Sequence, residues 1–154
     1  MNRAFVKESD QDTETLPERA VSEHTNFVTA RGLALLEASV RELEAQRTAA
    51  RGQDDRAVLA RVARDLRYFV SRRDSARLVQ PPAQPAVARF GVAVTVRLQD
   101  GQELRYRIVG EDEADPREGL ISYVSPIAKT LIGATVGATV EIGGQRTQII
   151  RLES

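Results

Sequence analysis

The run RYRIVGEDEADPREGLISYVSPIAKTLIGATVG, residues 105–137, decides the fold of the C-terminal half of this 154-residue chain. It opens with alternating apolar residues, which is typical of a strand with one buried face. An acidic loop follows, and Ser125 and Pro126 then begin a short segment that ends at Gly133. Serine suits an N-cap, proline the first helical position and glycine the residue after a helix. The run predicts a short helix whose apolar face is Ile127, Ala128, Leu131 and Ile132.

The flanking residues extend this pattern into a small sheet. Apolar and polar residues alternate over 92–98, Asp100-Gly101 is a strong hairpin signal, and the alternation resumes over 104–108. Residues 136–142 and 147–152 supply two more strands around Gly143-Gly144. Three of the six prolines lie in residues 80–86, which predicts a linker. We therefore expect residues 87–154 to form a small antiparallel sheet covered by one short helix.

Upstream of the linker, residues 29–79 predict two helices. Apolar residues recur there at spacings of three and four, which places them on one seam of each helix. The seam residues are Leu33, Leu36, Val40, Leu43, Arg47 and Ala50, then Leu59, Val62, Leu66, Phe69, Arg73 and Ala76. Gly52 suits a helix end, and Asp54 or Asp55 suits the next N-cap. The two helices are expected to form an antiparallel hairpin of the coiled-coil type.

Charge is distributed unevenly, although 22 basic and 22 acidic residues cancel. Residues 1–29 carry three Arg/Lys against six Asp/Glu, residues 30–79 eleven against seven, and residues 80–154 eight against nine. The excess in the middle third is all arginine, which can pair bidentately with phosphates. A solvated helix face with intrahelical ion pairs explains the same pattern. The acidic segment 1–28 is poor in apolar residues, and we expect it to be a disordered arm.

Composition excludes several kinds of site. Without cysteine there is no disulfide or thiolate centre, and the single His24 excludes a multi-histidine metal site. Any metal would need carboxylate ligands, which favours magnesium or manganese. No apolar run is long enough for a membrane helix and no signal peptide is evident, so a cytoplasmic protein without membrane contact is expected.

The ordered motifs in residues 90–133 resemble the C-terminal domain of the Gre-type (GreA/GreB) bacterial transcription elongation factors. The likeness is carried by Phe90-Gly91, residues 106–110, Glu113-Ala114-Asp115, Ile121-Ser122 and residues 125–128 with Leu131 and Gly133. The resemblance implies an α+β protein in which the hairpin precedes an FKBP-like domain. It also implies bacterial RNA polymerase as the partner, with the hairpin entering the secondary channel of the enzyme.

In this family, acidic residues at the hairpin tip hold a magnesium ion that promotes cleavage of backtracked RNA. Here only Asp54 and Asp55 stand at the tip, and the arm is shorter than in cleavage-competent members. The family's longer acidic tip motif is missing. The resemblance implies no stably bound cofactor, and at most a magnesium ion shared with the polymerase. A helix N-terminus prefers the same two carboxylates, so capping remains the alternative.

The resemblance also assigns the docking surface. It implies that Ser125, Pro126 and Ile127 face the polymerase, with Asp112, Glu113 and Asp115 of the acidic loop beside them. A simple helix start and a solvated loop are the alternatives. Arg47, Arg51 and Arg56 would face RNA or DNA within the complex.

Three functions remain open from the sequence. The first is an elongation regulator that assists cleavage by the polymerase without being an enzyme itself. The second is a channel-binding competitor or inhibitor that stimulates no cleavage, as in short-hairpin members such as Rnk. The third and weakest is an FKBP-like prolyl isomerase, for which Phe90, Tyr106 and Tyr123 are the aromatic residues of the domain. A monomer or weak self-association is expected.

Overall fold

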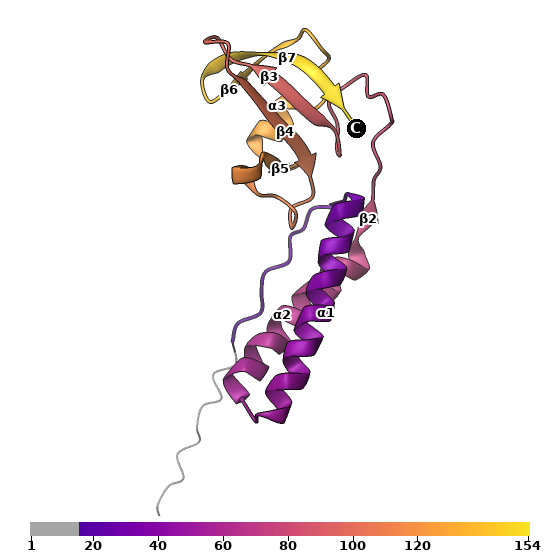
Figure 1. Cartoon of the computed structure of the whole chain (residues 1–154), viewed down its shortest axis with the longest axis vertical. Coiled ribbons are helices and arrows are strands. Elements are labelled where there is room, and N and C mark those ends of the chain that lie inside the picture. Colours follow the sequence, from indigo (N-terminus) through magenta and orange to yellow (C-terminus); the bar gives the residue numbers. More distant parts are fainter. Residues whose placement is uncertain (1–15) are drawn as a thin grey trace, which may run out of the picture.

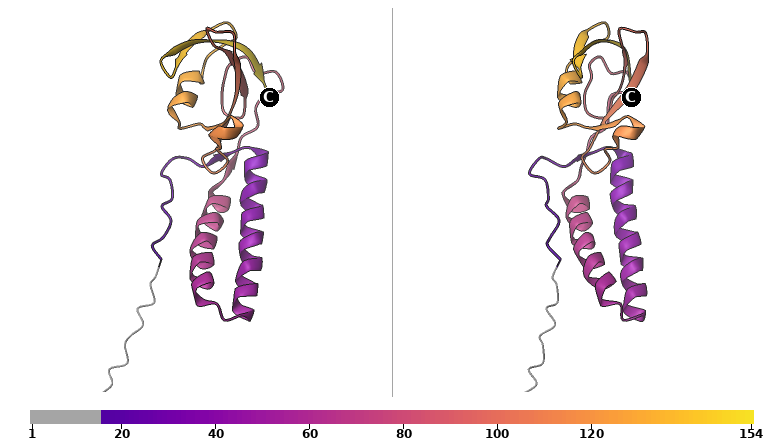
Figure 2. Two further views of the ribbon diagram at one scale, coloured as in Figure 1. Left: turned by 60° about the vertical axis from the view of Figure 1, so that its left-hand side comes forward. Right: turned by 90° about the vertical axis from the view of Figure 1, so that its left-hand side faces the viewer.

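The computed structural model describes residues 16–154, and it places a long helical hairpin below a curled sheet domain (Figure 1). The hairpin consists of α1 (Ala30–Gly52) and α2 (Arg56–Ser75). The two helices run side by side in opposite directions in both views of Figure 2. The α+β class is confirmed.

Each helix begins where a side-chain cap satisfies its free amides. The Thr29 hydroxyl accepts from the Gly32 amide at 2.9 Å, and the Asp55 carboxylate accepts from the Val58 amide at 3.1 Å. Leu36, Val40, Val62 and Leu66 are buried between the helices, as the apolar spacing predicts. Leu43 is only half-buried, and Arg72, which lies one position off the predicted seam, is buried.

The sheet domain is built from five strands in the order β5-β4-β3-β7-β6. They are β3 (Ala93–Arg97), β4 (Glu103–Val109), β5 (Leu120–Ser122), β6 (Thr139–Ile142) and β7 (Gln145–Glu153). A 3-10 turn, η1 (Pro116–Glu118), leads into β5, and α3 (Pro126–Leu131) packs against the sheet. The core consists of Ala88, Val92, Val94, Val96, Ile108, Ile121, Ala128, Leu131 and Ile149.

Two expectations for this domain need correction. The sheet is mixed, because β5 runs parallel to β4 after the chain has looped back through residues 110–119. Ile132 is 44% exposed, since α3 ends at Leu131 and the chain leaves the core there. The start of α3 is as predicted: Ser125 is the N-cap, and its hydroxyl accepts from the Ala128 amide at 3.3 Å.

The segment that precedes the hairpin has a defined course over residues 16–28, in contrast to the disordered arm expected for residues 1–28. It passes along α2 and ends in β1 (Phe27–Val28), which pairs in parallel with β2 (Arg77–Leu78). Side-chain contacts hold it: the Asn26 amide donates to the Arg72 carbonyl at 2.6 Å, and Arg19 lies 3.9 Å over the Tyr68 ring. Residues 1–15 of the expected arm lie outside the described residues. Among those described, no helix has the length and apolarity that crossing a membrane requires.

Candidate functional site

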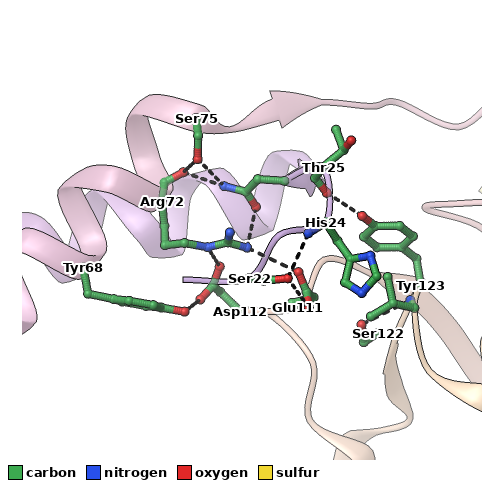
Figure 3. A network of polar contacts seen from close by, with 12 residues as sticks. Ser22, His24, Thr25, Tyr68, Arg72, Ser75, Glu111, Asp112, Ser122 and Tyr123 are labelled. Carbon is green, nitrogen blue, oxygen red and sulfur yellow. Dashed lines mark hydrogen bonds and ion pairs between the residues drawn. The ribbon is translucent and has the colours of Figure 1, made fainter. Parts of the chain in front are cut away.

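The junction between the hairpin and the sheet domain holds a network of polar contacts, and Figure 3 shows its centre. Three segments meet there: residues 22–29, the second half of α2, and the loop that follows β4. The acidic loop predicted from the sequence is this third segment. The carboxylates of Glu111, Asp112 and Glu113 contact the hairpin or the segment before it.

Arg72 lies at the centre of the network. Its side chain is only 2% exposed, and its Nε donates to Asp112 Oδ2 at 2.6 Å. Nη2 donates to Asn26 Oδ1 at 2.9 Å and lies 3.7 Å from Glu111 Oε2. Because a buried charge is costly unless it is paired, these contacts are what allow a guanidinium at this position.

Tyr68, one turn before Arg72, reaches the same carboxylate. Its hydroxyl donates to Asp112 Oδ1 at 2.5 Å. Burial and this hydrogen bond raise the pKa of Tyr68 to about 12, so the phenol stays protonated at neutral pH. Asp112 is thus bound from two successive turns of α2.

A second group of contacts fixes the other helix. Glu113 accepts from the Thr29 hydroxyl at 2.6 Å and from Arg31 at 3.1 Å, and its side chain is only 3% exposed. Thr29 is also the N-cap of α1, so one hydroxyl joins the helix start to the sheet domain. An added Cβ at Gly32 would lie 2.8 Å from the Glu113 carboxylate, which explains the glycine there.

An aromatic cluster completes the junction. The Phe27 ring lies 5.9 Å from Phe90 and 5.5 Å from Tyr123, in the tilted and edge-on arrangements that aromatic pairs prefer. The Tyr123 hydroxyl donates to the Thr25 carbonyl. Burial, helped by the charge of Glu111, raises the pKa of Tyr123. Phe27 from the hairpin side therefore covers two of the three aromatic residues that a prolyl isomerase cavity would use.

These contacts show where two residues of the acidic loop lie. Asp112 and Glu113 are predicted to be part of the docking surface, and in the structure both carboxylates are paired with side chains of the hairpin and its N-cap. The cause is the fold of the chain: residues 110–115 turn back between the two units, where basic side chains of α1 and α2 compensate their charge. Asp115 lies apart, as the cap of η1, and its hydrogen bond and ion pair with Arg117 lower its pKa.

The Ser-Pro turn lies on the sheet domain and closely follows Tyr123, whose hydroxyl and ring belong to the junction. Pro126 is exposed, Ser125 is half-exposed, and Ile127 packs partly against the core. The exposed part of this turn is available for contact, while Ile127 has a mainly structural position.

The hairpin tip lies at the opposite end of the molecule from the sheet domain (Figure 1). Asp55 caps α2, and Asp54 is exposed in the left-handed region with φ 51°. Within residues 16–154, no cluster of three or more His, Asp or Glu is arranged to hold a metal ion. Arg51 and Arg56 are exposed beside these two carboxylates and Arg47 is half-buried, and none of the three has a carboxylate of the described chain within 4.0 Å.

Sequence reasoning missed Arg72, Tyr68, Asn26 and Phe27. One feature of the sequence indicates part of the junction. Four carboxylates lie close together in residues 111–115 and repel one another, so a basic surface nearby is needed to compensate their charge. Tyr68 and Arg72 stand four residues apart, on one helix face beside the apolar seam. Nothing in the local sequence links that face to the loop, because 40 residues separate Arg72 from Asp112.

Comparison with known proteins relates the C-terminal half of the chain to one protein family. Residues 83–153 match the family described as transcription elongation factor, GreA/GreB, C-term. The chain is 41% identical over 76 residues to transcription elongation factor GreB of Pseudomonas aeruginosa, covering 49% of this chain and 45% of the relative. It is 36% identical over 94 residues to GreA of Paracoccus denitrificans, covering 58% of each.

The matched part thus spans only about half the length of these relatives. Among solved structures, the GreA/GreB factor of Nitrosomonas europaea is 19% identical, with a TM-score of 0.43 over 86% of this chain and all of that one. The GreA factor homolog 1 of Thermus thermophilus is 16% identical, with a TM-score of 0.42 over 85% of this chain and all of the other. The C-terminal domain of the chain is therefore similar in sequence to the C-terminal domain of the Gre-type (GreA/GreB) transcription elongation factors.

Proposed function

We propose that this protein is a regulator of transcription elongation that binds bacterial RNA polymerase at the secondary channel. The observation that supports it best is a GreA/GreB C-terminal domain joined to a helical hairpin through a buried ionic junction. Such an arrangement offers a docking surface at one end and a slender projecting element at the other. The chain itself would catalyse nothing and would act through the polymerase.

The exposed edge of the Ser-Pro turn is the proposed docking contact, with Pro126 and Ser125 at its centre and Ile127 behind them. Asp115 remains a neighbour of this surface, whereas Asp112 and Glu113 belong to the junction. Replacing Pro126 with Ala should weaken polymerase binding while the thermal unfolding temperature changes little. Equal binding by this variant and the parent would contradict the docking contact.

A specific observation favours the second candidate, a channel-binding competitor that stimulates no cleavage. Asp55 already accepts a backbone hydrogen bond as a helix cap, which leaves Asp54 as the one free carboxylate of the pair. A hard cation such as magnesium takes about six oxygen ligands, so nearly all of them would have to come from the polymerase. Arg51 and Arg56 beside these carboxylates would also oppose a cation and suit the phosphates of RNA or DNA.

The deciding experiment is a transcript-cleavage assay on stalled elongation complexes, run beside a binding measurement. The Asp54→Asn/Asp55→Asn double variant keeps a capping side chain at position 55 but lacks the negative charge that magnesium requires. If the parent binds without stimulating cleavage and the double variant behaves identically, the competitor role is supported. Cleavage stimulated by the parent and lost in the double variant would establish the metal-delivering role instead.

The arginine surface at the tip has its own test. Arg51→Gln/Arg56→Gln should reduce affinity for the elongation complex, and the loss should shrink as salt rises, because contacts with phosphates release counterions. Arg97→Gln, an exposed arginine of the sheet domain paired with Glu103, is the matched control. Equal losses for both changes would point to a general charge effect.

A further inference from the structure

Arg72 is a buried charge whose partners all come from other segments of the chain. Nε and Nη2 reach Asp112 in the sheet domain and Asn26 in the segment before α1, and Glu111 lies close by. The Asn26 amide in turn donates to the Arg72 carbonyl at 2.6 Å and to the Ser75 hydroxyl at 3.2 Å. One side chain therefore joins both units of the protein and the strand that enters the hairpin (Figure 3).

The geometry of these contacts is directional. A planar guanidinium with its donors in a fixed fork meets its acceptors in one orientation only. If the hairpin tilted, the Arg72 guanidinium, which is only 2% exposed, would lose the carboxylates that compensate its charge, which is strongly unfavourable. The aromatic contacts of Phe27 also favour particular ring arrangements, but these preferences are weaker than those of charge-assisted hydrogen bonds, so they would restrain a tilt less.

The connections between the two units give no such restraint. They are residues 79–87, which contain Pro81, Pro82 and Pro85 and no helix or strand, and the short β1–β2 ribbon. A chain joined in this way turns about its linker unless side chains hold it. The restraint must come from the junction itself.

We infer that Arg72 is a positioning residue: it fixes the hairpin in one orientation relative to the sheet domain. Without its charge the two units still fold but move about residues 76–87. This inference concerns the free protein. Its consequence for transcription rests on the proposed function, because a hairpin held at one angle can enter a channel while the sheet domain docks outside it.

The orientation can be measured directly, because the chain contains no cysteine. Spin labels on Ala45→Cys in α1 and Thr139→Cys in β6, both exposed positions, report the distance between the two units. We expect one narrow distance distribution for the parent and its loss in Arg72→Met, with partial recovery in Arg72→Lys. Arg73→Met is the matched control: Arg73 pairs with Asp74 of its own helix at 2.9 Å and should leave the distribution narrow.

Circular dichroism would show that each variant keeps its helices. A folded Arg72→Met variant with an unchanged narrow distribution overturns the inference. If that variant does not fold, Asp112→Asn is measured in the same way, and a parent-like distribution then overturns it.

Polymerase assays separate the two proposals. A parent that does not bind polymerase refutes the proposed function, while the distance measurement still decides the role of Arg72. If the parent binds, Arg72→Met should retain docking but lose its competition with a cleavage-stimulating Gre factor. Full competition by a variant whose distribution has broadened would refute the functional consequence.

Discussion

At the junction, single residues determine how closely the hairpin and the sheet domain can approach each other. Gly110 follows β4, and an added Cβ would collide with the Phe27 carbonyl oxygen of β1. Backbone cannot move aside as the end of a flexible side chain can. The close approach of the two units therefore requires glycine at this position.

Gly110→Ala should accordingly lower the free energy of unfolding by about 1–3 kcal/mol, the usual cost of overpacking. Gly52→Ala is the control: it lies in α1 with open space around it, and alanine there should be neutral or slightly stabilising. Chemical denaturation of both variants measures the difference. A Gly110→Ala protein as stable as the parent would mean that the two units do not approach as closely as described.

Tyr68 gives the junction a pH dependence at high pH. Its folded pKa of about 12 lies above the ordinary value of 10.0, so the folded state favours the neutral phenol. The resulting stabilisation is complete below pH 10 and is lost as pH rises toward 12. Phenolate absorbance of the parent should show a component that titrates near 12 and is missing in Tyr68→Phe, and a titration of Tyr68 near 10 would contradict the contact with Asp112.

At the scale of elements, local signals predicted most of what forms. The caps at Thr29, Asp55 and Ser125 lie where side-chain chemistry places them, and both helices follow their apolar spacing. The parallel pairing of β5 with β4 was not predicted, because residues 120–122 are too short to show which neighbour they pair with. The role of the acidic loop was missed for a related reason, since its partners lie about 40 to 90 residues away along the chain.

The hairpin seam allows a graded test. Leu36 is 2% exposed and Leu43 is half-buried, so the cost of truncation should differ between them. Leu36→Ala should lower the free energy of unfolding by about 2–5 kcal/mol, and Leu43→Ala by clearly less. Thermal or denaturant unfolding measures both, with the exposed Glu42→Ala as a control that should barely register. A larger effect at Leu43 than at Leu36 would refute the helical phase.

The whole molecule combines two units that depend on each other unequally. The core of the sheet domain is drawn from residues 88–149 alone, so nothing in the hairpin is needed to fill it. The hairpin, by contrast, has buried positions that the sheet domain completes: Arg72 needs Asp112, and Thr29 is bonded to Glu113. Removing the sheet domain should therefore destabilise the hairpin more than removing the hairpin destabilises the sheet domain.

This asymmetry predicts that residues 83–154 fold alone, whereas residues 16–80 alone form a weaker hairpin. The isolated sheet domain loses Phe27 from beside Phe90 and Tyr123, so it should unfold at a lower temperature than the same domain in the full chain. If docking lies on the Ser-Pro turn, this fragment should still bind polymerase but should not compete for the channel, because it has no hairpin. Circular dichroism, thermal unfolding and polymerase pull-down on both fragments test these expectations.

A sheet domain that folds yet shows no affinity for polymerase, under conditions where the full chain binds, would mean that the main contact lies on the hairpin. An unfolded fragment would instead show that the junction is part of the core.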